Sequence, residues 1–246
     1  MIEASGLGRR FGETWALKNI QLQVAPGEFL AVLGRNGAGK TTLVRLLTGQ
    51  MRPTEGTVTI AGHDPAGAPT ELRRLVGVMP EEGALLEDLG GSQYLHFAGR
   101  LHGIPMATLE ARIRELEACL QVDFHTPCPI RDYSYGMKKK LAFSSAILHG
   151  PAVVFLDEPF EGLDPSVVRT LLELLGHLRS QGVTLVMTSH QLSLAERLCT
   201  RVILVEEGQA ILDGPAAEIL GPDEDLEGLF LRLVGRKVKA GGLSWM

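Results

Sequence analysis

The chain has 246 residues, of which 45% are hydrophobic and 22% are charged, and its formal net charge at pH 7 is -5. This composition is that of a globular protein, and the length allows one domain with a large core and a smaller lobe. The net negative charge argues against nucleic acid or an anionic membrane as the partner of the protein as a whole.

The sequence also argues against secretion and against a membrane span. The three cysteines, Cys119, Cys128 and Cys199, are widely spaced and form no CxxC pair, so they indicate neither a disulfide framework nor a zinc site. The N-terminal residues lack the apolar core of a signal peptide, and no stretch approaches the ~20 consecutive apolar residues of a spanning helix. We therefore expect a cytoplasmic protein whose role at any membrane depends on a partner.

Three short apolar runs, at residues 29–33, 153–156 and 183–187, predict parallel strands that are buried on both faces. Polar residues or glycine follow each run: Gly34 after the first, Asp157 after the second, and the sequence Thr-Ser-His after the third. Ligands of open parallel sheets bind beyond the carboxyl ends of the strands. We therefore expect these residues to meet at one edge of the sheet.

Two helices are expected to alternate with these strands. The first follows Lys40 and stops at Gly49, and glycine is a common residue at the end of a helix. The second has Asp164 as its N-cap and Pro165 at its first position, and it ends near Gly182. Its apolar side chains recur at helical spacing, so we expect one face of this helix to be buried.

Further short strands are expected to be antiparallel. They lie at residues 57–60, 201–205 and 209–212. Glu207 and Gly208 supply the hairpin turn between the last two strands. These segments indicate that the sheet structure is not entirely parallel.

Residues 82–149 have a helical pattern and predict a lobe inserted into the α/β core. An apolar stripe at helical spacing contains Leu109, Ile113, Leu116 and Leu120. The lysines at 138–140 are expected to form a solvated helix face, and the alternative is an interaction patch. The lobe is also expected to expose an apolar surface for a partner, with these candidates: Leu85, Leu86, Leu89 and Tyr94.

The last segment, residues 226–246, predicts a short amphipathic helix and a basic end. The apolar face of this helix consists of Leu226, Leu229, Phe230 and Leu233. The basic end contains glycine, and chain ends of this composition commonly fray. We therefore expect the helix to pack and the end to remain at the surface.

Residues 34–41, GRNGAGKT, match the phosphate-loop pattern G-x-x-x-x-G-K-[ST] in full. Backbone N–H groups of such a loop and of the following helix N-terminus bind the phosphates of a nucleotide. Lys40 adds positive charge toward the β- and γ-phosphates, and the Thr41 hydroxyl can ligate Mg²⁺. The candidate nucleotide contacts here are Gly34, Arg35, Asn36, Gly37, Ala38, Gly39, Lys40, Thr41 and Thr42.

Two carboxylates, Asp157 and Glu158, follow the second apolar strand. Asp157 can hold Mg²⁺ through water, and Glu158 can polarise the water that attacks the γ-phosphate. Two such residues after a buried strand would on their own be read as loop residues. Their place in a chain with a phosphate loop favours the catalytic interpretation.

These motifs, with YSYGMKKK at 133–140, FLDEP, GLDP and TSH in this order, resemble those of the ABC-transporter ATPase family along nearly the whole chain. The resemblance implies an α/β fold: a P-loop NTPase core with a mostly parallel sheet, an antiparallel β portion and an inserted α-helical subdomain. It divides one domain into a nucleotide-binding core (1–81 and 150–225), a helical subdomain with the signature motif (82–149), and a C-terminal helix and tail (226–246).

The resemblance also implies roles for single residues. Ser134 and Gly136 fall in the family's signature segment, which reaches the γ-phosphate bound by the other subunit of a head-to-tail dimer. Asp164 falls in the loop through which the two sites communicate. His190 matches the switch histidine that contacts the γ-phosphate. Phe11 falls where the family has an aromatic residue stacked on adenine, with Trp15 and a core role for Phe11 as the alternatives.

The chain departs from the commoner family pattern in the signature and at Glu81. Tyr133 and Tyr135 stand where leucine and glycine are usual in the signature, while the residues with phosphate roles are kept. Glu81 follows Met79-Pro80 where most of the family has glutamine. A carboxylate there can still ligate Mg²⁺, a cation that prefers oxygen donors, and the alternative is a solvated loop residue.

The departures around Glu81 and in the signature are familiar in the branch that includes drug, antibiotic and lipid exporters. The resemblance therefore implies an ATPase that pairs with itself or a paralogue around two Mg-ATP. This dimer drives a separate integral-membrane permease, with export as the favoured direction, and lies on the cytoplasmic face of the membrane through that permease. The alternatives are a non-transport ABC-type ATPase acting on nucleic acid or ribosomes, and a P-loop kinase or GTPase. We expect no nucleic-acid partner.

Overall fold

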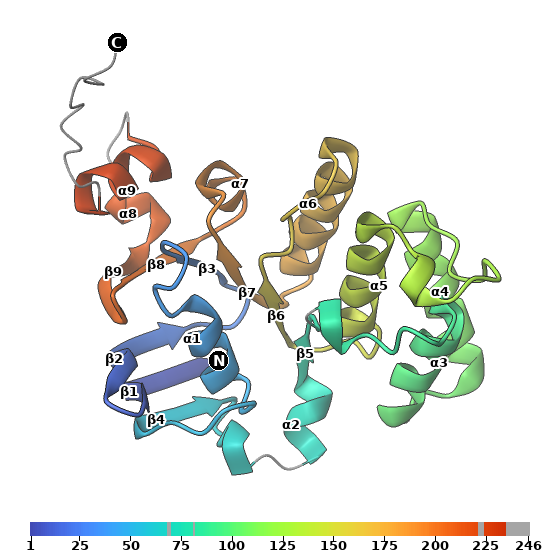
Figure 1. Cartoon of the computed structure of the whole chain (residues 1–246), viewed down its shortest axis with the longest axis horizontal. Coiled ribbons are helices and arrows are strands. Elements are labelled where there is room, and N and C mark those ends of the chain that lie inside the picture. Colours follow the sequence, from blue (N-terminus) through green and yellow to red (C-terminus); the bar gives the residue numbers. More distant parts are fainter. Residues whose placement is uncertain (68–69, 81, 221–223, 235–246) are drawn as a thin grey trace, which may run out of the picture.

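The structure, a computed structural model, describes residues 1–67, 70–80, 82–220 and 224–234 and contains two β-sheets (Figure 1). The smaller sheet is antiparallel, in the order β2 (Thr14–Val24), β1 (Ile2–Phe11) and β4 (Glu55–Ile60). The larger sheet has the order β5 (Val76–Val78), β6 (Val153–Asp157), β7 (Thr184–Ser189), β3 (Phe29–Leu33), β8 (Arg201–Glu206) and β9 (Gln209–Pro215).

The larger sheet is parallel except at one edge. Strands β5, β6, β7, β3 and β8 pair in parallel, and β9 pairs with β8 in the antiparallel direction. The three apolar runs predicted as buried parallel strands are its central strands. The segment 201–205 was predicted only as antiparallel, whereas β8 also pairs in parallel with β3. The mixed α/β fold class is confirmed.

The predicted turn between β8 and β9 is confirmed. Glu207 and Gly208 have φ angles of 46° and 78°, and such positive angles at both central residues are those of a tight hairpin turn.

Alternate side chains of β3 face opposite sides of the larger sheet, so the core has two layers. Phe29, Ala31 and Leu33 face one side of the sheet, where α6 (Pro165–Ser180) and α7 (Leu192–Glu196) pack. Leu30 and Val32 face α1 (Lys40–Leu47), which lies between the two sheets and contacts strands of both. Strand β3 is therefore covered on both faces. The phosphate loop, residues 34–41, follows directly after its carboxyl end, which is the edge where open parallel sheets bind ligands.

The helical lobe lies at the right of Figure 1, beyond β5 and α6. It contains α3 (Gly91–Leu101), α4 (Met106–Leu120), α5 (Tyr135–Ile147) and the short 3₁₀ helices Glu82–Ala84 and Ile130–Asp132. The predicted apolar stripe of α4 is buried, as expected. Outside the lobe, Pro65–Gly67 forms a 3₁₀ helix and Thr70–Leu75 forms α2.

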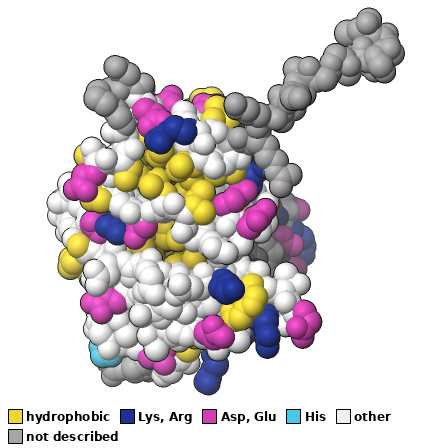
Figure 2. Space-filling view, turned by 90° about the vertical axis from the view of Figure 1, so that its left-hand side faces the viewer, with side chains coloured by type: hydrophobic (Ala, Val, Ile, Leu, Met, Phe, Trp, Pro, Cys, Tyr) yellow, Lys and Arg dark blue, Asp and Glu magenta, His cyan; other side chains and the backbone are white. Residues whose placement is uncertain are grey.

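The last two described helices, α8 (Ala216–Ile219) and α9 (Leu226–Val234), lie on the side of the molecule opposite the lobe. Figure 2 shows that hydrophobic side chains gather in the upper half of this face, bordered by acidic and basic ones. Leu226 and Leu229 of α9 are buried, whereas Leu233 is exposed, so the predicted apolar face of this helix is only partly covered. The predicted basic end lies outside the described residues. Among the described helices, none combines the length and the apolar character required to cross a bilayer.

Candidate functional site

The phosphate loop joins β3 to α1, and Lys40 is the first residue of that helix. The Lys40 ammonium donates hydrogen bonds to the carbonyl oxygens of Gly34 at 2.9 Å and Arg35 at 3.4 Å. The side chain is 7% exposed, so the lysine folds over its own loop and holds its charge there. This position concentrates positive charge beside the loop's backbone N–H groups, which is what phosphate binding requires.

Close packing against strands of both sheets explains two of the three glycines of this loop. A Cβ on Gly39, whose φ is 110°, would lie 2.6 Å from the carbonyl oxygen of Ala16 in β2. A Cβ on Gly34 would lie 2.3 Å from the carbonyl oxygen of Val205 in β8. Both distances are far inside van der Waals contact, so side chains at these positions would force the loop away from the two strands.

Asp157 lies at the carboxyl end of β6, and its partner in β7 is Thr188. The Thr188 hydroxyl donates a hydrogen bond to Asp157 Oδ1 and accepts one from the Glu158 N–H at 2.9 Å. Thr188 is buried, so this hydroxyl orders both acidic residues. The sequence prediction named the Thr-Ser-His segment but not Thr188 as a site residue, because the cross-strand register was needed to reveal the contact.

The Glu158 carboxylate lies between two predicted site residues. Its Oε2 accepts hydrogen bonds from the His190 backbone N–H at 3.2 Å and from His190 Nδ1 at 2.9 Å. Its Oε1 is 3.5 Å from Lys40 Nζ. The backbone of Glu158 has a φ of 45°, an uncommon left-handed conformation for a residue other than glycine. The three proposed catalytic side chains, from α1, the end of β6 and the end of β7, are therefore brought together.

A pocket of about 340 Å³ opens beside these residues. Its lining comes from β2, the phosphate loop, α1 and the acidic end of β6: Ala16, Arg35, Asn36, Gly37, Gly39, Lys40, Thr41, Thr42 and Glu158. Gly34 and Ala38 belong to the same loop but do not line the pocket. The pocket can hold an anionic group between the loop and the Glu158 carboxylate.

Two of the three predicted ligands of a divalent cation, Thr41 and Asp157, lie in the part of the chain that the structure describes. Thr41 offers a hydroxyl at the pocket, and Asp157 offers a carboxylate at the end of the neighbouring strand. Oxygen donors of these kinds are those that Mg²⁺ prefers. Glu81, the third predicted ligand, lies outside the described residues.

Four other predicted residues do not line the pocket. Phe11 ends β1 with 48% of its surface exposed and lies 4.9 Å below the Arg9 guanidinium. Ser134 is the exposed N-cap of α5, and its hydroxyl accepts a hydrogen bond from the Met137 N–H at 3.3 Å. Gly136 follows in the first turn of that helix. Asp164 is the exposed N-cap residue of α6, as predicted, although its side chain makes no capping hydrogen bond.

Two expectations about the helical lobe are wrong. The lysines at 138–140 do not form a solvated face: Lys138 pairs with Glu87 at 2.9 Å, Lys139 donates to the Glu158 carbonyl oxygen at 3.1 Å, and Lys140 donates to a carbonyl oxygen of the α4 end. All three are partly buried because α5 packs against other segments. Lys139 is thus a contact of the candidate site that the sequence did not reveal.

The proposed apolar partner surface is also different. Leu85 and Tyr94 are buried, Leu89 packs against the core, and Leu86 alone of the four candidates is exposed. Leu85 and Tyr94 fill the interior of the lobe, so they are not available to a partner. The other large apolar side chains that the lobe exposes are Phe97, Leu101 and Met106.

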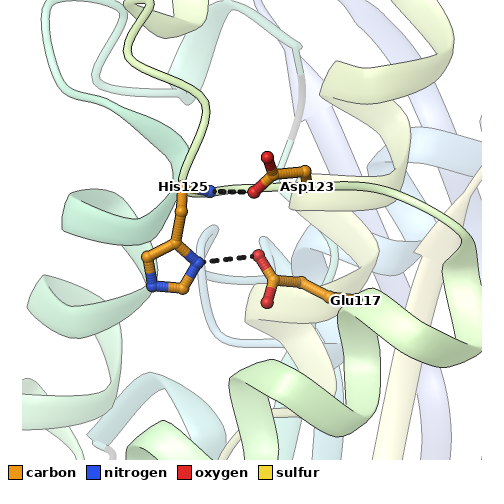
Figure 3. A group of neighbouring side chains, drawn as sticks. All are labelled: Glu117, Asp123 and His125. Atoms are coloured by element: carbon orange, nitrogen blue, oxygen red, sulfur yellow. Dashed lines mark hydrogen bonds and ion pairs between the residues drawn. The ribbon is translucent and has the colours of Figure 1, made fainter.

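A group of metal-ligating residue types lies far from the phosphate loop, at the end of α4 (Figure 3). It consists of Glu117, Asp123 and His125. Glu117 Oε1 accepts a hydrogen bond from the Phe124 N–H at 2.7 Å and lies 3.0 Å from His125 Nδ1. Asp123 Oδ1 accepts one from the His125 N–H at 2.8 Å. The carboxylates therefore order the loop that leaves α4, which accounts for their positions.

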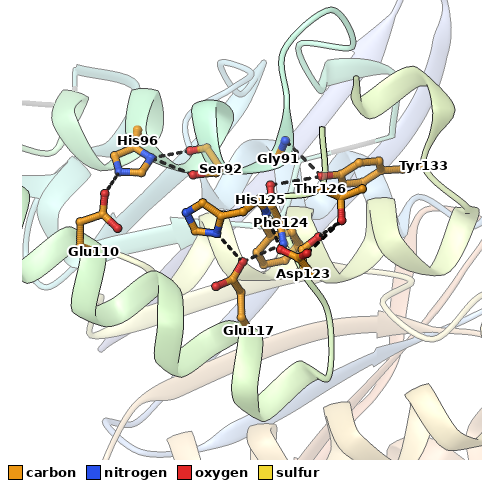
Figure 4. Close-up of polar contacts among 10 residues, drawn as sticks. All are labelled: Gly91, Ser92, His96, Glu110, Glu117, Asp123, Phe124, His125, Thr126 and Tyr133. Atoms are coloured by element: carbon orange, nitrogen blue, oxygen red, sulfur yellow. Dashed lines mark hydrogen bonds and ion pairs between the residues drawn. The ribbon is translucent and has the colours of Figure 1, made fainter. Parts of the chain in front are cut away.

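Neighbouring polar contacts join the helices of the lobe to one another, and the Tyr133 hydroxyl also donates to the Phe124 carbonyl oxygen of this loop (Figure 4). The His96 ring spans α3 and α4, with Nδ1 2.7 Å from the Ser92 carbonyl oxygen and Nε2 2.7 Å from Glu110 Oε1. The Tyr133 hydroxyl accepts a hydrogen bond from the Gly91 N–H at 3.2 Å. These bonds fix the lobe that carries Ser134 and Gly136.

Comparison with known proteins agrees with this geometry. The family model described as ABC transporter matches residues 17–161, which include the phosphate loop and both acidic residues. The daunorubicin resistance ATP-binding protein DrrA3 of Streptomyces coeruleorubidus is 36% identical over 218 residues, which cover 89% of this chain and 69% of that protein. The Nod factor export ATP-binding protein I of Ralstonia nicotianae is 33% identical over 220 residues, which cover 89% of this chain and 68% of that protein.

Solved structures give the same result. The structure of an ATP-binding subunit of an ABC transporter has a TM-score of 0.88 and 29% identity, and the match covers 95% of this chain and 99% of that one. A dimeric ATP-binding cassette in a post-hydrolysis state, bound to ADP and phosphate, has a TM-score of 0.80 at 22% identity, over 87% of this chain and 98% of that one. The second likeness concerns the fold alone. The chain therefore belongs to the ABC transporter family, as one of its ATP-binding subunits with ATPase activity.

Proposed function

We propose that this chain hydrolyses Mg-ATP at the pocket beside Lys40 and, as a head-to-tail dimer, drives a separate membrane permease that exports its substrate. The observation that carries the hydrolytic part is the position of the Glu158 carboxylate at the phosphate-loop pocket, held by His190 and facing Lys40. A general base needs this proximity to the bound phosphate and a fixed orientation.

Each of the three residues has a separate task. Lys40 stabilises the negative charge that develops on the transferred phosphoryl group. Glu158 orients the attacking water and accepts its proton. His190 holds one carboxylate oxygen of Glu158 so that the other faces the pocket, and it contacts the γ-phosphate when nucleotide is bound.

Thr41, Asp157 and Glu81 are the proposed ligands of Mg²⁺. When bound, the cation neutralises charge on the β- and γ-phosphates. Thr188 orients Asp157 for this task through its hydroxyl. The position of Thr41 at the pocket and the bond from Thr188 to Asp157 support the roles of these two residues, and the role of Glu81 rests on the family pattern.

A second chain would complete each site. Ser134, Gly136 and Asp164 lie outside their own chain's pocket, and Ser134 and Asp164 are exposed, which supports their use across a dimer interface. Phe11 is half exposed at the end of β1 and could stack on adenine. The partner chain is either a second copy of this chain or a paralogous ATPase.

A hollow between the core and the helical lobe is the proposed docking place for the permease. It measures about 390 Å³ and is lined by the end of α1, α2, β5, the end of α3 and the end of α5, with His102, His149 and Arg73 among its residues. The exposed Phe97 and Leu101 lie on α3, the same helix that ends at His102. Docking there would place the ATPase on the cytoplasmic face of the membrane.

Export is supported by the names of two relatives, one a drug-resistance protein and one a Nod factor export protein. None of the relatives' names reported above favours the alternative, an ATPase that acts on nucleic acid or ribosomes.

The variant Glu158→Gln tests the hydrolytic proposal. Loss of a general base should lower ATP turnover by about 10²–10⁴-fold, whereas ATP binding should remain and ATP-bound dimers should accumulate in size-exclusion chromatography. Glu161→Gln, a change at an exposed glutamate three residues away, is the matched control. Turnover near the wild-type value in Glu158→Gln would contradict the proposal.

A further inference from the structure

Tyr135, which stands where the family signature commonly has glycine, packs against the loop that follows Glu158. Its ring lies over Gly162: a Cβ added to Gly162 would be 2.8 Å from Tyr135 Cε1. Gly162 also has a φ of 67°, so glycine is the residue that suits both the backbone and the ring. The first turn of α5 and the loop before α6 are therefore fitted to each other.

The same ring contacts Lys139, one helical turn further along α5. The Lys139 ammonium lies 5.5 Å from the centre of the Tyr135 ring. Side chains four residues apart lie on the same face of a helix, and an aromatic ring attracts a cation above its face. The ring thus limits the directions that the lysine side chain can take.

Lys139 in turn holds the backbone of Glu158. Its ammonium donates to the Glu158 carbonyl oxygen at 3.1 Å, and the Glu158 N–H donates to Thr188 at 2.9 Å. The backbone N–H and carbonyl groups of Glu158 are therefore both bonded to other elements. These bonds support a left-handed φ of 45°, which is unfavourable for a residue that has a Cβ. The direction of the Glu158 carboxylate depends on this backbone conformation.

We propose that Tyr135 is a positioning residue for ATP hydrolysis, whose ring directs Lys139 to the Glu158 carbonyl within the same subunit. This inference rests on the proposed role of Glu158 as the general base. Tyr135 does not line the phosphate-loop pocket of its own chain, so within that chain its effect is on the catalytic step and not on the affinity for ATP.

Steady-state ATPase measurements separate the two effects. Tyr135→Ala should lower kcat by about 10- to 100-fold and leave the KM for ATP unchanged, because a displaced base affects only the transition state. Tyr135→Phe keeps the ring and should retain wild-type kcat. Lys139→Met should reproduce the loss, and the double variant Tyr135→Ala/Lys139→Met should be no slower than either single variant.

Two controls keep the result interpretable. Lys140→Met removes the neighbouring positive charge, which bonds to the Gln121 carbonyl oxygen and not to Glu158, and should leave kcat unchanged. Thermal unfolding should show that Tyr135→Ala is folded, and Tyr135→Leu provides a second ring-free variant if it is not. A ring-free variant that is folded and as fast as Tyr135→Phe would overturn the inference.

Dimers of two differently tagged chains, purified by both tags, test whether the ring acts in its own subunit. Pairing a Tyr135→Ala chain with a Lys40→Ala chain leaves one working site, which uses Glu158 of the Tyr135→Ala chain. This dimer should be slower than wild type paired with Lys40→Ala. Pairing wild type with a Tyr135→Ala/Lys40→Ala chain should match that reference dimer, and slowing of this last dimer to the same degree or more would overturn the inference.

The outcomes also separate this inference from the proposed function. If Glu158→Gln retains turnover, the role of Glu158 as base fails. If Glu158→Gln abolishes turnover but Tyr135→Ala does not reduce kcat, the base remains and the positioning role of Tyr135 fails alone.

Discussion

His149 joins the helical lobe to the core, and its lowered pKa makes the stability of the fold depend on pH. It follows α5, its Nε2 lies 3.1 Å from the Val76 carbonyl oxygen in β5, and its ring stacks on that of His102 with centroids 3.8 Å apart. Burial foremost, and then the neighbouring His102 and Arg112, lowers the pKa of His149 from 6.5 to about 4, although the bond to Val76 acts in the opposite direction. Burial also lowers the pKa of His102.

The direction of the effect follows from proton binding. The unfolded chain protonates His149 below about pH 6.5, but the folded chain does so only below about pH 4. Between these values the unfolded state binds more protons, so the free energy of unfolding falls as the pH falls. The full shift corresponds to about 3 kcal/mol, of which about 2 kcal/mol is lost by pH 5. Because part of the ring borders solvent, we reduce the expected loss to about 1 kcal/mol.

Urea unfolding of wild type and His149→Gln at about pH 7.5 and about pH 5 measures this loss. Glutamine can still donate to the Val76 carbonyl oxygen but does not titrate. Between about pH 7.5 and about pH 5, the free energy of unfolding should therefore fall by about 1 kcal/mol more in wild type than in the variant. For a chain of this size this corresponds to about 2–4 °C in Tm. His63→Gln, at an exposed histidine, should keep the wild-type pH dependence. Equal losses in wild type and His149→Gln would refute the reasoning.

Three further changes have definite expected outcomes. Thr188→Val removes the hydroxyl that bonds Asp157 and Glu158, so the free energy of unfolding in urea should fall by about 1–3 kcal/mol and kcat in ATPase assays should be lower. Thr188→Ser keeps a hydroxyl and should retain most of the stability and of kcat. Identical behaviour of the two variants would contradict the contact. Gly39→Ala should abolish ATP binding in a chain that circular dichroism shows to be folded, because its Cβ collides with β2; binding of normal affinity would mean that the loop can move. Leu101→Ser should spare ATPase activity and weaken association with the co-purifying permease, with Ile211→Ser on the distant β9 as the control; unchanged association would place the docking surface elsewhere.

The features that the sequence predicted well are those specified by neighbouring residues. The phosphate loop depends on a short run of glycines between an apolar strand and a helix, and the N-terminus of α6 depends on Asp164 and Pro165. Local pattern was also sufficient for the buried face of α4, since side chains at helical spacing share one face. Strand β5 has only three residues, too few to show any pattern, and its existence depends on pairing with β6.

The contacts that the sequence did not predict join elements distant along the chain. Thr188 meets Asp157 because β6 and β7 pair in a particular register, which no local pattern specifies. Lys139 was interpreted as solvated because lysine usually is, but α5 packs so that its side chain reaches the end of β6. Leu85 and Tyr94 were expected at the surface but fill the interior of the lobe. The sequence does not show which apolar residues of the lobe another helix covers.

The contacts of Glu158 connect the two parts of the molecule. Thr188 and His190 hold it from the core, while Lys139 holds it from the helical lobe. A movement of α5 away from the sheet would lengthen the bond from Lys139, whereas the bonds from Thr188 and His190 lie within the core. The conformation of Glu158 is unfavourable without support, so this single bond can make hydrolysis sensitive to the position of the lobe. The proposed permease site borders the same lobe, so docking there would act on the lobe that bonds the proposed base.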